Sequence, residues 1–263
     1  MIIDVHTHAW PENVSQKARS SLEALFKVTF VGEPTLATLE RYMKANGVTT
    51  SVISSVATKP QQVPVINDWL FGIRKEHIRV FCALHPQYSE WEKELARIKD
   101  RGDGIKLQPE FQDFYVDEER MFPVYERIAA LKLPLLFHTG EELSGTMEVH
   151  SSPHRLIKIK ERLPHITIIA AHFGGFRLTD EAEQFLVGRD IYLDTSFFFD
   201  YLPRERVRKL LLAHRPDRIL FGSDFPLIDP KKDIDFLKSL DLPLALQEKI
   251  FFSNAQKLLK PLA

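Results

Sequence analysis

The feature that most constrains the fold is a repeated alternation of short apolar segments and stretches with helical periodicity. The apolar segments lack strict apolar–polar alternation, which is typical of parallel strands covered by helices. Eight strands are predicted: 2–8, 48–54, 78–84, 104–107, 134–137, 166–171, 191–194 and 218–221.

A helical stretch follows each predicted strand, so the chain reads as eight consecutive β–α units. The first connection, residues 9–34, is long and contains a possible helix over 15–25, which we interpret as a lid. The other helices are expected at 35–46, 60–75 with an interruption near Pro64, 89–101 with Ser89 as N-cap, 118–132, 153–163, 178–187, 204–214, 233–240 and 244–259. This order predicts an α/β protein in which residues 1–263 form a single-domain (β/α)8 TIM barrel. A doubly wound open sheet is the alternative, but no Gly-rich phosphate loop follows any strand.

Composition narrows the class of protein further. The 263 residues are 44% hydrophobic, enough for a sizeable core, and the net charge of −1 favours neither nucleic acid nor an anionic membrane as partner. The single Cys82 excludes an internal disulfide and fits a reducing compartment. No apolar run reaches membrane-spanning length, and the first strand begins at residue 2. We therefore expect a cytoplasmic protein without a leader that acts on a small molecule, with a homo-oligomer left open.

Side chains able to bind metals or carry protons stand at the ends of the predicted strands. Parallel strands of a barrel end at one common mouth, so these side chains are expected to converge. They are His6 and His8 in the first strand, then Lys106, His138, His172, Asp194 and Asp224 at the fourth to eighth.

The first strand carries its polar residues at a spacing of two. Asp4, His6 and His8 therefore share one face of the strand, and two neutral imidazoles one pleat apart can reach the same divalent ion. A site of this kind keeps one position open for water or substrate.

The motifs around these residues resemble the amidohydrolase superfamily. More closely, the chain is similar to the amidohydrolase-related branch, which also holds enzymes of the aminocarboxymuconate-semialdehyde decarboxylase type. The closing residues 254–259 resemble that branch's C-terminal signature. The motifs are Asp4-Val5-His6-Thr7-His8, Gly104-Ile105-Lys106-Leu107, Phe137-His138-Thr139-Gly140, Ala171-His172-Phe173-Gly174-Gly175 and Gly222-Ser223-Asp224-Phe225-Pro226.

The resemblance implies one divalent ion, with Zn2+ expected, bound by His6, His8, His138 and Asp224. Asp224 would accept a proton from the metal-bound water and deliver it to the leaving group. His172 would stand beside the ion and stabilise an oxyanion.

Lys106 has three interpretations. In binuclear members of the superfamily a carboxylated lysine of the fourth strand bridges two ions, which here implies a second site of Lys106, His138 and His172. In members with one metal, the lysine would face the substrate or a carboxylate. It can also simply extend from the strand end as a bystander.

Further candidates depend on weaker patterns. Asp4 either orients a ligand histidine or binds backbone, while Asp194 and His85 are expected behind the ligands or in the substrate pocket. The pocket rim is predicted from residues 9–34, 141–152 and 197–201. Possible substrate contacts are Glu141, Glu142, His150 and His154, and Asn254 is predicted to cap the last helix.

Four functions remain to be separated. The leading prediction is a metal-dependent hydrolase of a lactone, ester or amide, and the alternative is a non-oxidative decarboxylase on the same scaffold. A TatD-type deoxyribonuclease is disfavoured because Gly104-Ile105-Lys106 stands where that family has a glutamate. The last is a barrel that binds a small molecule without catalysis. The complete set of potential metal-binding residues argues against it.

Overall fold

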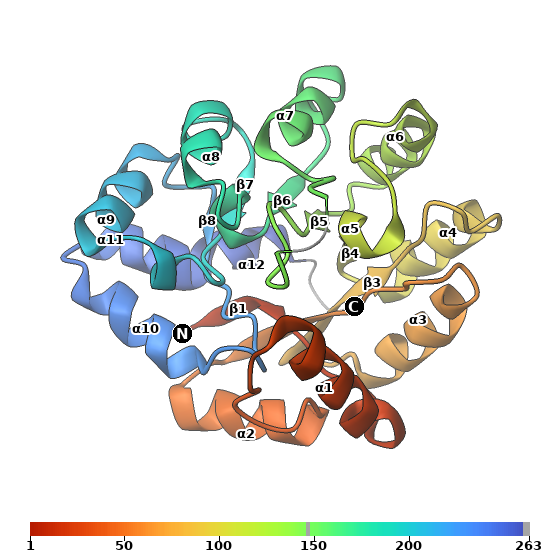
Figure 1. Ribbon diagram of the computed structural model, residues 1–263, viewed down its shortest axis with the longest axis horizontal. Helices are drawn as coiled ribbons and strands as arrows, with labels where there is room; N and C mark the ends of the chain where they lie inside the picture. The colour runs from red at the N-terminus through yellow and green to blue at the C-terminus, as the bar shows by residue number, and fades with distance from the viewer. Residues whose placement is uncertain (146–147, 260–263) are drawn as a thin grey trace.

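A computed structural model describes residues 1–145 and 148–259. Eight parallel strands lie in the order β1 to β8 in one sheet, with helices around them (Figure 1). Backbone hydrogen bonds from Val5 N to Phe221 O (2.9 Å) and from Asp224 N to His6 O (2.8 Å) join the last strand to the first. The predicted TIM barrel is therefore confirmed. The strands are β1 Ile3–Thr7, β2 Thr50–Ser54, β3 Ile78–Ala83, β4 Gly104–Leu107, β5 Leu135–Phe137, β6 Ile168–Ala170, β7 Tyr192–Asp194 and β8 Ile219–Leu220.

Several strands are shorter than the apolar runs that predict them. Val48, for example, is apolar and buried, but its N–H donates to Met43 O and completes the end of the preceding helix. An apolar run therefore indicates buried residues, but the strand itself begins only where hydrogen bonds to the neighbouring parallel strand begin.

The helices follow the strands in the predicted order. The longer ones are α1 Glu12–Phe26, α2 Leu36–Asn46, α3 Gln62–Ile73, α4 Trp91–Arg101, α6 Phe122–Ala130, α7 Pro153–Arg162, α8 Thr179–Phe185, α9 Arg204–Ala213 and α10 Pro230–Ser239. Short helical turns are α5 Pro109–Gln112, η1 Glu119–Met121, η2 His172–Gly174 and η3 Phe199–Tyr201.

Two helix predictions were wrong in detail. Pro64 does not interrupt α3, because it lies in the first turn, where a backbone N–H has no partner within the helix. Ser89 is not the N-cap of α4; Glu90 holds that position without a capping hydrogen bond from its side chain.

The C-terminal helical region is segmented. It consists of α11 Leu244–Glu248, a π-helical turn η4 over Lys249–Ser253, and α12 Asn254–Leu258. The prediction that Asn254 is a cap was wrong: its side-chain amide donates to Ile219 O (2.8 Å) and Pro216 O (3.0 Å). Asn254 thus ties α12 to β8.

The interior of the barrel is filled by apolar side chains from its strands, together with Ala255 of α12 and Leu259 directly after that helix. A second, larger layer packs between strands and outer helices. In the part of the chain that the structure describes, none of the helices has the length and apolar character of a membrane span. The inner strand residues are Ile3, Val5, Val52, Phe81, Leu136, Ile169 and Leu220.

Candidate metal centre

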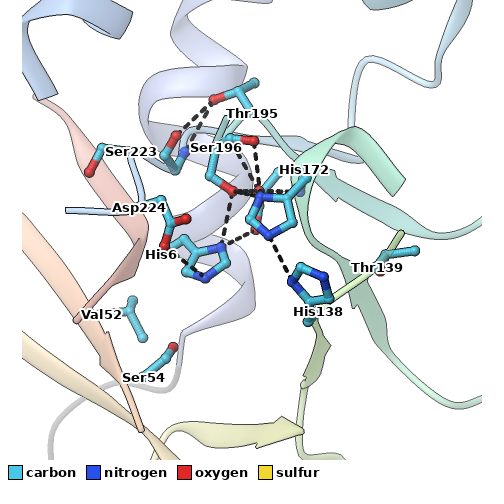
Figure 2. A network of polar contacts seen from close by, with 12 residues as sticks. His6, Val52, Ser54, His138, Thr139, His172, Thr195, Ser196, Ser223 and Asp224 are labelled. Carbon is cyan, nitrogen blue, oxygen red and sulfur yellow. Dashed lines mark hydrogen bonds and ion pairs between the residues drawn. The ribbon is translucent and has the colours of Figure 1, made fainter. Parts of the chain in front are cut away.

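His6, His8 and Asp224 converge at the carboxyl ends of β1 and β8 (Figure 2 shows His6 and Asp224). Asp224 Oδ1 lies 3.0 Å from His8 Nε2 and 3.6 Å from His6 Nε2. One ligand atom from each of the three residues lies within 4.8 Å of the others. Three predicted ligands therefore form one group.

Hydrogen bonds fix which ring nitrogen of each histidine carries hydrogen. A carbonyl or carboxylate oxygen only accepts, so His8 Nδ1 donates to Ser54 O (2.9 Å) and His6 Nδ1 donates to Asp194 Oδ2 (2.9 Å). In the neutral rings, both Nε2 atoms then carry lone pairs, which point toward Asp224.

This donor set fits a divalent cation. A lone pair of His8 Nε2 faces a carboxylate oxygen at 3.0 Å, and two such groups repel unless a proton or a cation lies between them. Two imidazoles and one carboxylate, each oriented by a further hydrogen bond, are ligands that zinc and manganese accept.

His138 and His172 repeat this arrangement on the neighbouring strands. His172 Nδ1 donates to Ser196 O (3.2 Å) and His138 Nε2 donates to Glu141 O (3.1 Å). Their remaining nitrogens, His172 Nε2 and His138 Nδ1, face each other at 3.1 Å, as Figure 2 shows. Two lone pairs again require a cation or a proton between them. From the sequence, His138 was predicted to bind the same ion as His6, His8 and Asp224. In the structure, the His138 ring is directed toward His172.

The backbone around these ligands adopts unusual conformations. Asp224 and His172 have φ angles of 65° and 57°, in the left-handed region that few residues other than Gly, Asn and Asp occupy readily. Gly140 follows β5 with φ +99°, and a Cβ there would lie 2.3 Å from Phe176 N. The loops that carry His138 and His172 can approach this closely only because residue 140 is glycine.

Asp194 at the end of β7 orients the site from behind. Its Oδ1 accepts the backbone N–H groups of His172 and Ser196, both at 3.1 Å, and its Oδ2 accepts from His6 Nδ1. One fully buried carboxylate thus positions two candidate ligands. Asp4 has a different role, because its Oδ1 accepts from the backbone N–H groups of His6 (3.2 Å) and Ser223 (3.1 Å) and so links β1 to the end of β8.

Burial controls the charges in this region. It lowers the pKa of the His172 ring to about 4, and burial together with Lys106 lowers the pKa of His6, so both rings are neutral ligands at pH 7. Lys106 extends into the site from β4, with Nζ 3.4 Å from His6 Nε2. Burial lowers the pKa of Lys106, against the attraction of Asp224 and Asp194.

A second acidic group lies beside His138 and was largely missed by the sequence interpretation. His138 Nε2 is 3.4 Å from Glu142 Oε1, which also accepts a hydrogen bond from Gln108, and Glu110 belongs to the same buried group. Burial, then Glu110, raises the pKa of Glu142 to about 8. The available signal was the pair of polar residues Gln108 and Glu110, which stand one and three positions after the end of β4.

The site opens into a cavity of about 910 Å³ at the carboxyl end of the barrel. The cavity walls come from residues 10–30, from Glu141–Leu143 and from Phe197, where the sequence placed the rim. The loop prediction over 141–152 includes residues 146 and 147, which lie outside the described residues. The polar floor of the cavity consists of His6, His8, Lys106, Gln108, His138, Glu142, His172 and Asp224.

Three predicted histidines lie elsewhere. His85 accepts a hydrogen bond from Gln87 N, His150 packs on Tyr115 with 4.5 Å between ring centroids, and His154 pairs with Glu181 at 2.6 Å. None of the three is among the described residues that line the cavity.

Histidines and a carboxylate gathered at the carboxyl end of a barrel are a candidate metal centre of a TIM-barrel protein. The chain belongs to the amidohydrolase family, whose sequence model matches residues 3–260. This match confirms the family resemblance that the sequence motifs indicated. No protein of curated function matches the chain by sequence.

Solved structures with the same fold include two decarboxylases. The 2,6-dihydroxybenzoate decarboxylase from Rhizobium aligns with a TM-score of 0.72 and 17% identity, covering 98% of both chains. The dihydroxybenzoic acid decarboxylase from Polaromonas, solved with bound manganese, aligns with 0.70 and 17%, covering 98% of this chain and 96% of that one. A putative 2-pyrone-4,6-dicarboxylic acid hydrolase from Pseudomonas putida aligns with 0.69 and 17%, with the same coverage. Identities this low show a shared fold alone.

Proposed function

We propose that this protein is a metal-dependent non-oxidative decarboxylase of an aromatic or similarly planar carboxylic acid. The observation that carries the proposal is the cavity, where one buried lysine, Lys106, stands among candidate metal ligands beneath aromatic walls. The decarboxylases that share the fold act on hydroxylated benzoic acids, which are planar acids of this kind. The proposal replaces the leading prediction from sequence, hydrolysis, with its alternative.

The proposed residues have distinct tasks. His6, His8 and Asp224 would hold a divalent ion, Zn2+ or Mn2+, and that ion when bound supplies a Lewis acid for substrate oxygens. Lys106 would attract the carboxylate of the substrate to the floor, because no other lysine or arginine among the described lining residues lies there. Phe176 and Phe197 on the cavity wall would flank the ring and exclude water.

The proposed step is a balanced exchange of CO2 for a proton. The bond between the ring carbon and the carboxylate breaks, its electron pair stays on the carbon, and CO2 leaves. Asp224 would take up a proton from solvent water and pass it to that carbon, which forms the C–H bond and leaves Asp224 ionised again, so each CO2 released consumes one solvent proton. Asp194 and Ser196 keep His6 and His172 in place during this transfer, since they hydrogen-bond to both rings or their backbone.

A hydrolase is the second candidate, favoured by one specific observation. Two separate pairs of facing lone-pair atoms, His8 with Asp224 and His138 with His172, offer room for two ions, with Lys106 close to His6. Two ions suit activation of a water molecule for hydrolysis.

A substrate panel distinguishes the two functions. The purified protein, loaded with zinc or manganese, is given hydroxylated benzoic acids and, separately, lactones, esters and amides. We expect CO2 release equal to the acid consumed. Hydrolysis of a lactone, ester or amide without CO2 release from any acid would contradict the proposal and favour the hydrolase.

A further inference from the structure

Helix α1 has an apolar side that the barrel does not use. Its single buried residue is Ser15, and the described residues that form the core include none from α1. Phe26 at its end stacks on Phe111 of α5, with 6.1 Å between ring centroids. An amphipathic helix normally buries its apolar stripe against the core. The stripe of α1 is therefore directed at something else.

That stripe lines the cavity. Val14, Ala18 and Leu22 recur every four residues, so they share one helix face, and all three are on the cavity wall. Helix α3 contributes Ile66 and Trp69 to the same cavity. Figure 1 shows α1 beside α3.

The two helices also leave apolar surface in contact with water at the cavity mouth. Val14 is 39% exposed and Val65, from α3, is 71% exposed, although both line the cavity. Covering these two side chains would release water from apolar surface, which favours binding of an apolar group.

The size of the cavity leaves room for such a group. Its volume of about 910 Å³ is near the upper end of ordinary ligand pockets. The polar floor lies at the strand ends, whereas α1 and α3 stand at the outer part of the cavity. A single-ring acid held at the floor would leave the outer part unfilled.

We propose that the space between α1 and α3 is a subsite for an extended apolar substituent of the substrate, such as an alkyl chain. This rests on the proposed function for the acid group at the floor, and it names the class of substrate: a planar acid with an apolar tail. The tail lies along Val14, Leu22, Val65 and Trp69.

The test is a binding series measured by isothermal titration calorimetry with the metal-loaded protein. The ligands are 2-hydroxybenzoate and its 4-alkyl derivatives from methyl to hexyl. We expect affinity to rise about threefold per methylene, because each buried methylene is removed from water. An affinity that does not change along the series would overturn the proposal.

A pair of variants locates the subsite. In Val14→Ser/Val65→Ser the ratio of hexyl to methyl affinity should fall about tenfold. The matched control is Leu212→Ser/Leu244→Ser, in which two aliphatic residues of similar exposure (43% and 82%) lie on α9 and α11 away from the cavity. The control should keep the ratio of the unmodified protein. An equal fall in both variants would contradict the location.

Binding and turnover separate this inference from the proposed function. If affinity rises with chain length but no CO2 is released, the subsite stands and the decarboxylase proposal fails. If the acids are decarboxylated with the same affinity at every length, the function stands and the subsite is wrong. If affinity is flat and Val65→Ser abolishes a concentration-dependent dimer, the exposed valines serve contact between chains and the inference is overturned.

Discussion

Each candidate ligand histidine donates one N–H to a protein oxygen and presents its other nitrogen to the site. The acceptors are Ser54 at the end of β2, Glu141 after β5, and Asp194 and Ser196 at the end of β7. Such hydrogen bonds fix the ring orientation before any ion binds, so less ordering remains to be done on binding. Metal binding should therefore depend on the acceptor residues as well as on the histidines themselves.

Asp224→Asn should separate proton transfer from metal binding. Asparagine tolerates the left-handed backbone at φ 65° and its amide oxygen keeps the shape of the ligand, so fold and much of the bound metal should remain. Turnover should fall at least about a hundredfold, the scale of a lost acid–base group. Steady-state kinetics and metal analysis of the same sample measure both. Full activity on a confirmed substrate would exclude Asp224 as the proton donor.

Asp194→Asn should weaken metal binding without removing a ligand. The variant loses the negative charge that accepts from His6 Nδ1, so the ring is no longer held in the tautomer that points a lone pair at the site. Zinc affinity, measured by competition with a chelator, should fall about 10- to 100-fold. The control is Asp190→Asn. Asp190 lies before the opposite end of β7, away from the site, and pairs with Arg218. Equal affinity in Asp194→Asn and the unmodified protein would contradict this role.

At the scale of elements, Asn254 connects the last helix to the last strand. Asn254→Ala leaves the carbonyl groups of Ile219 and Pro216 without their side-chain donor. We expect the free energy of unfolding to fall by about 1–3 kcal/mol in urea titrations. Gln256→Ala, exposed on the same helix, is the control and should change stability by less than about 0.5 kcal/mol. Equal losses in both variants would refute the connection.

Helix α10 contains a buried carboxyl that should oppose folding as pH rises. Burial, then Asp200, raises the pKa of Asp233 to about 8, and its Oδ2 has no hydrogen-bond partner among the described residues. Between pH 4 and 8 the unfolded chain ionises this group while the folded protein keeps it protonated, so stability is lost across that range. Asp233→Asn should therefore raise the free energy of unfolding by roughly 2 kcal/mol at pH 8 and little at pH 4. A gain of equal size at both pH values would contradict this assignment.

The elements differ in how far sequence can predict them. The strands were predictable because parallel strands in a barrel are apolar on both faces, and their polar end residues, such as His138 after β5, mark the mouth directly. Pro64 and Asn254 were misjudged because local rules for breaking and capping helices ignore tertiary position. Pro64 falls in a first turn, and Asn254 finds its acceptors in a distant strand.

At the site, the strand-end residues were predictable but their partners were not. His6 and Asp224 follow from position on the strands, whereas the grouping of Glu142 with Glu110 depends on two loops that meet in space. Likewise, the direction of the His138 ring toward His172 is set by the carbonyl of Glu141 and by Gly140, and no local pattern contains that information.

For the whole molecule, a rigid barrel holds the site and the loops around it form the cavity. The closed sheet fixes the relative positions of β1, β5, β6 and β8, so the candidate ligands need little rearrangement to meet an ion. Residues 10–30 and α3 build most of the outer wall, which is where substrate choice belongs in this fold.

The central claim is that a divalent ion binds at the ends of β1 and β8. The most direct test is a crystal structure of the zinc-loaded protein with anomalous data collected at the zinc edge. We expect an anomalous peak about 2.0–2.2 Å from His6 Nε2, His8 Nε2 and an Asp224 carboxylate oxygen. A zinc-loaded crystal with its peak elsewhere, or with none at these three residues, would contradict the account.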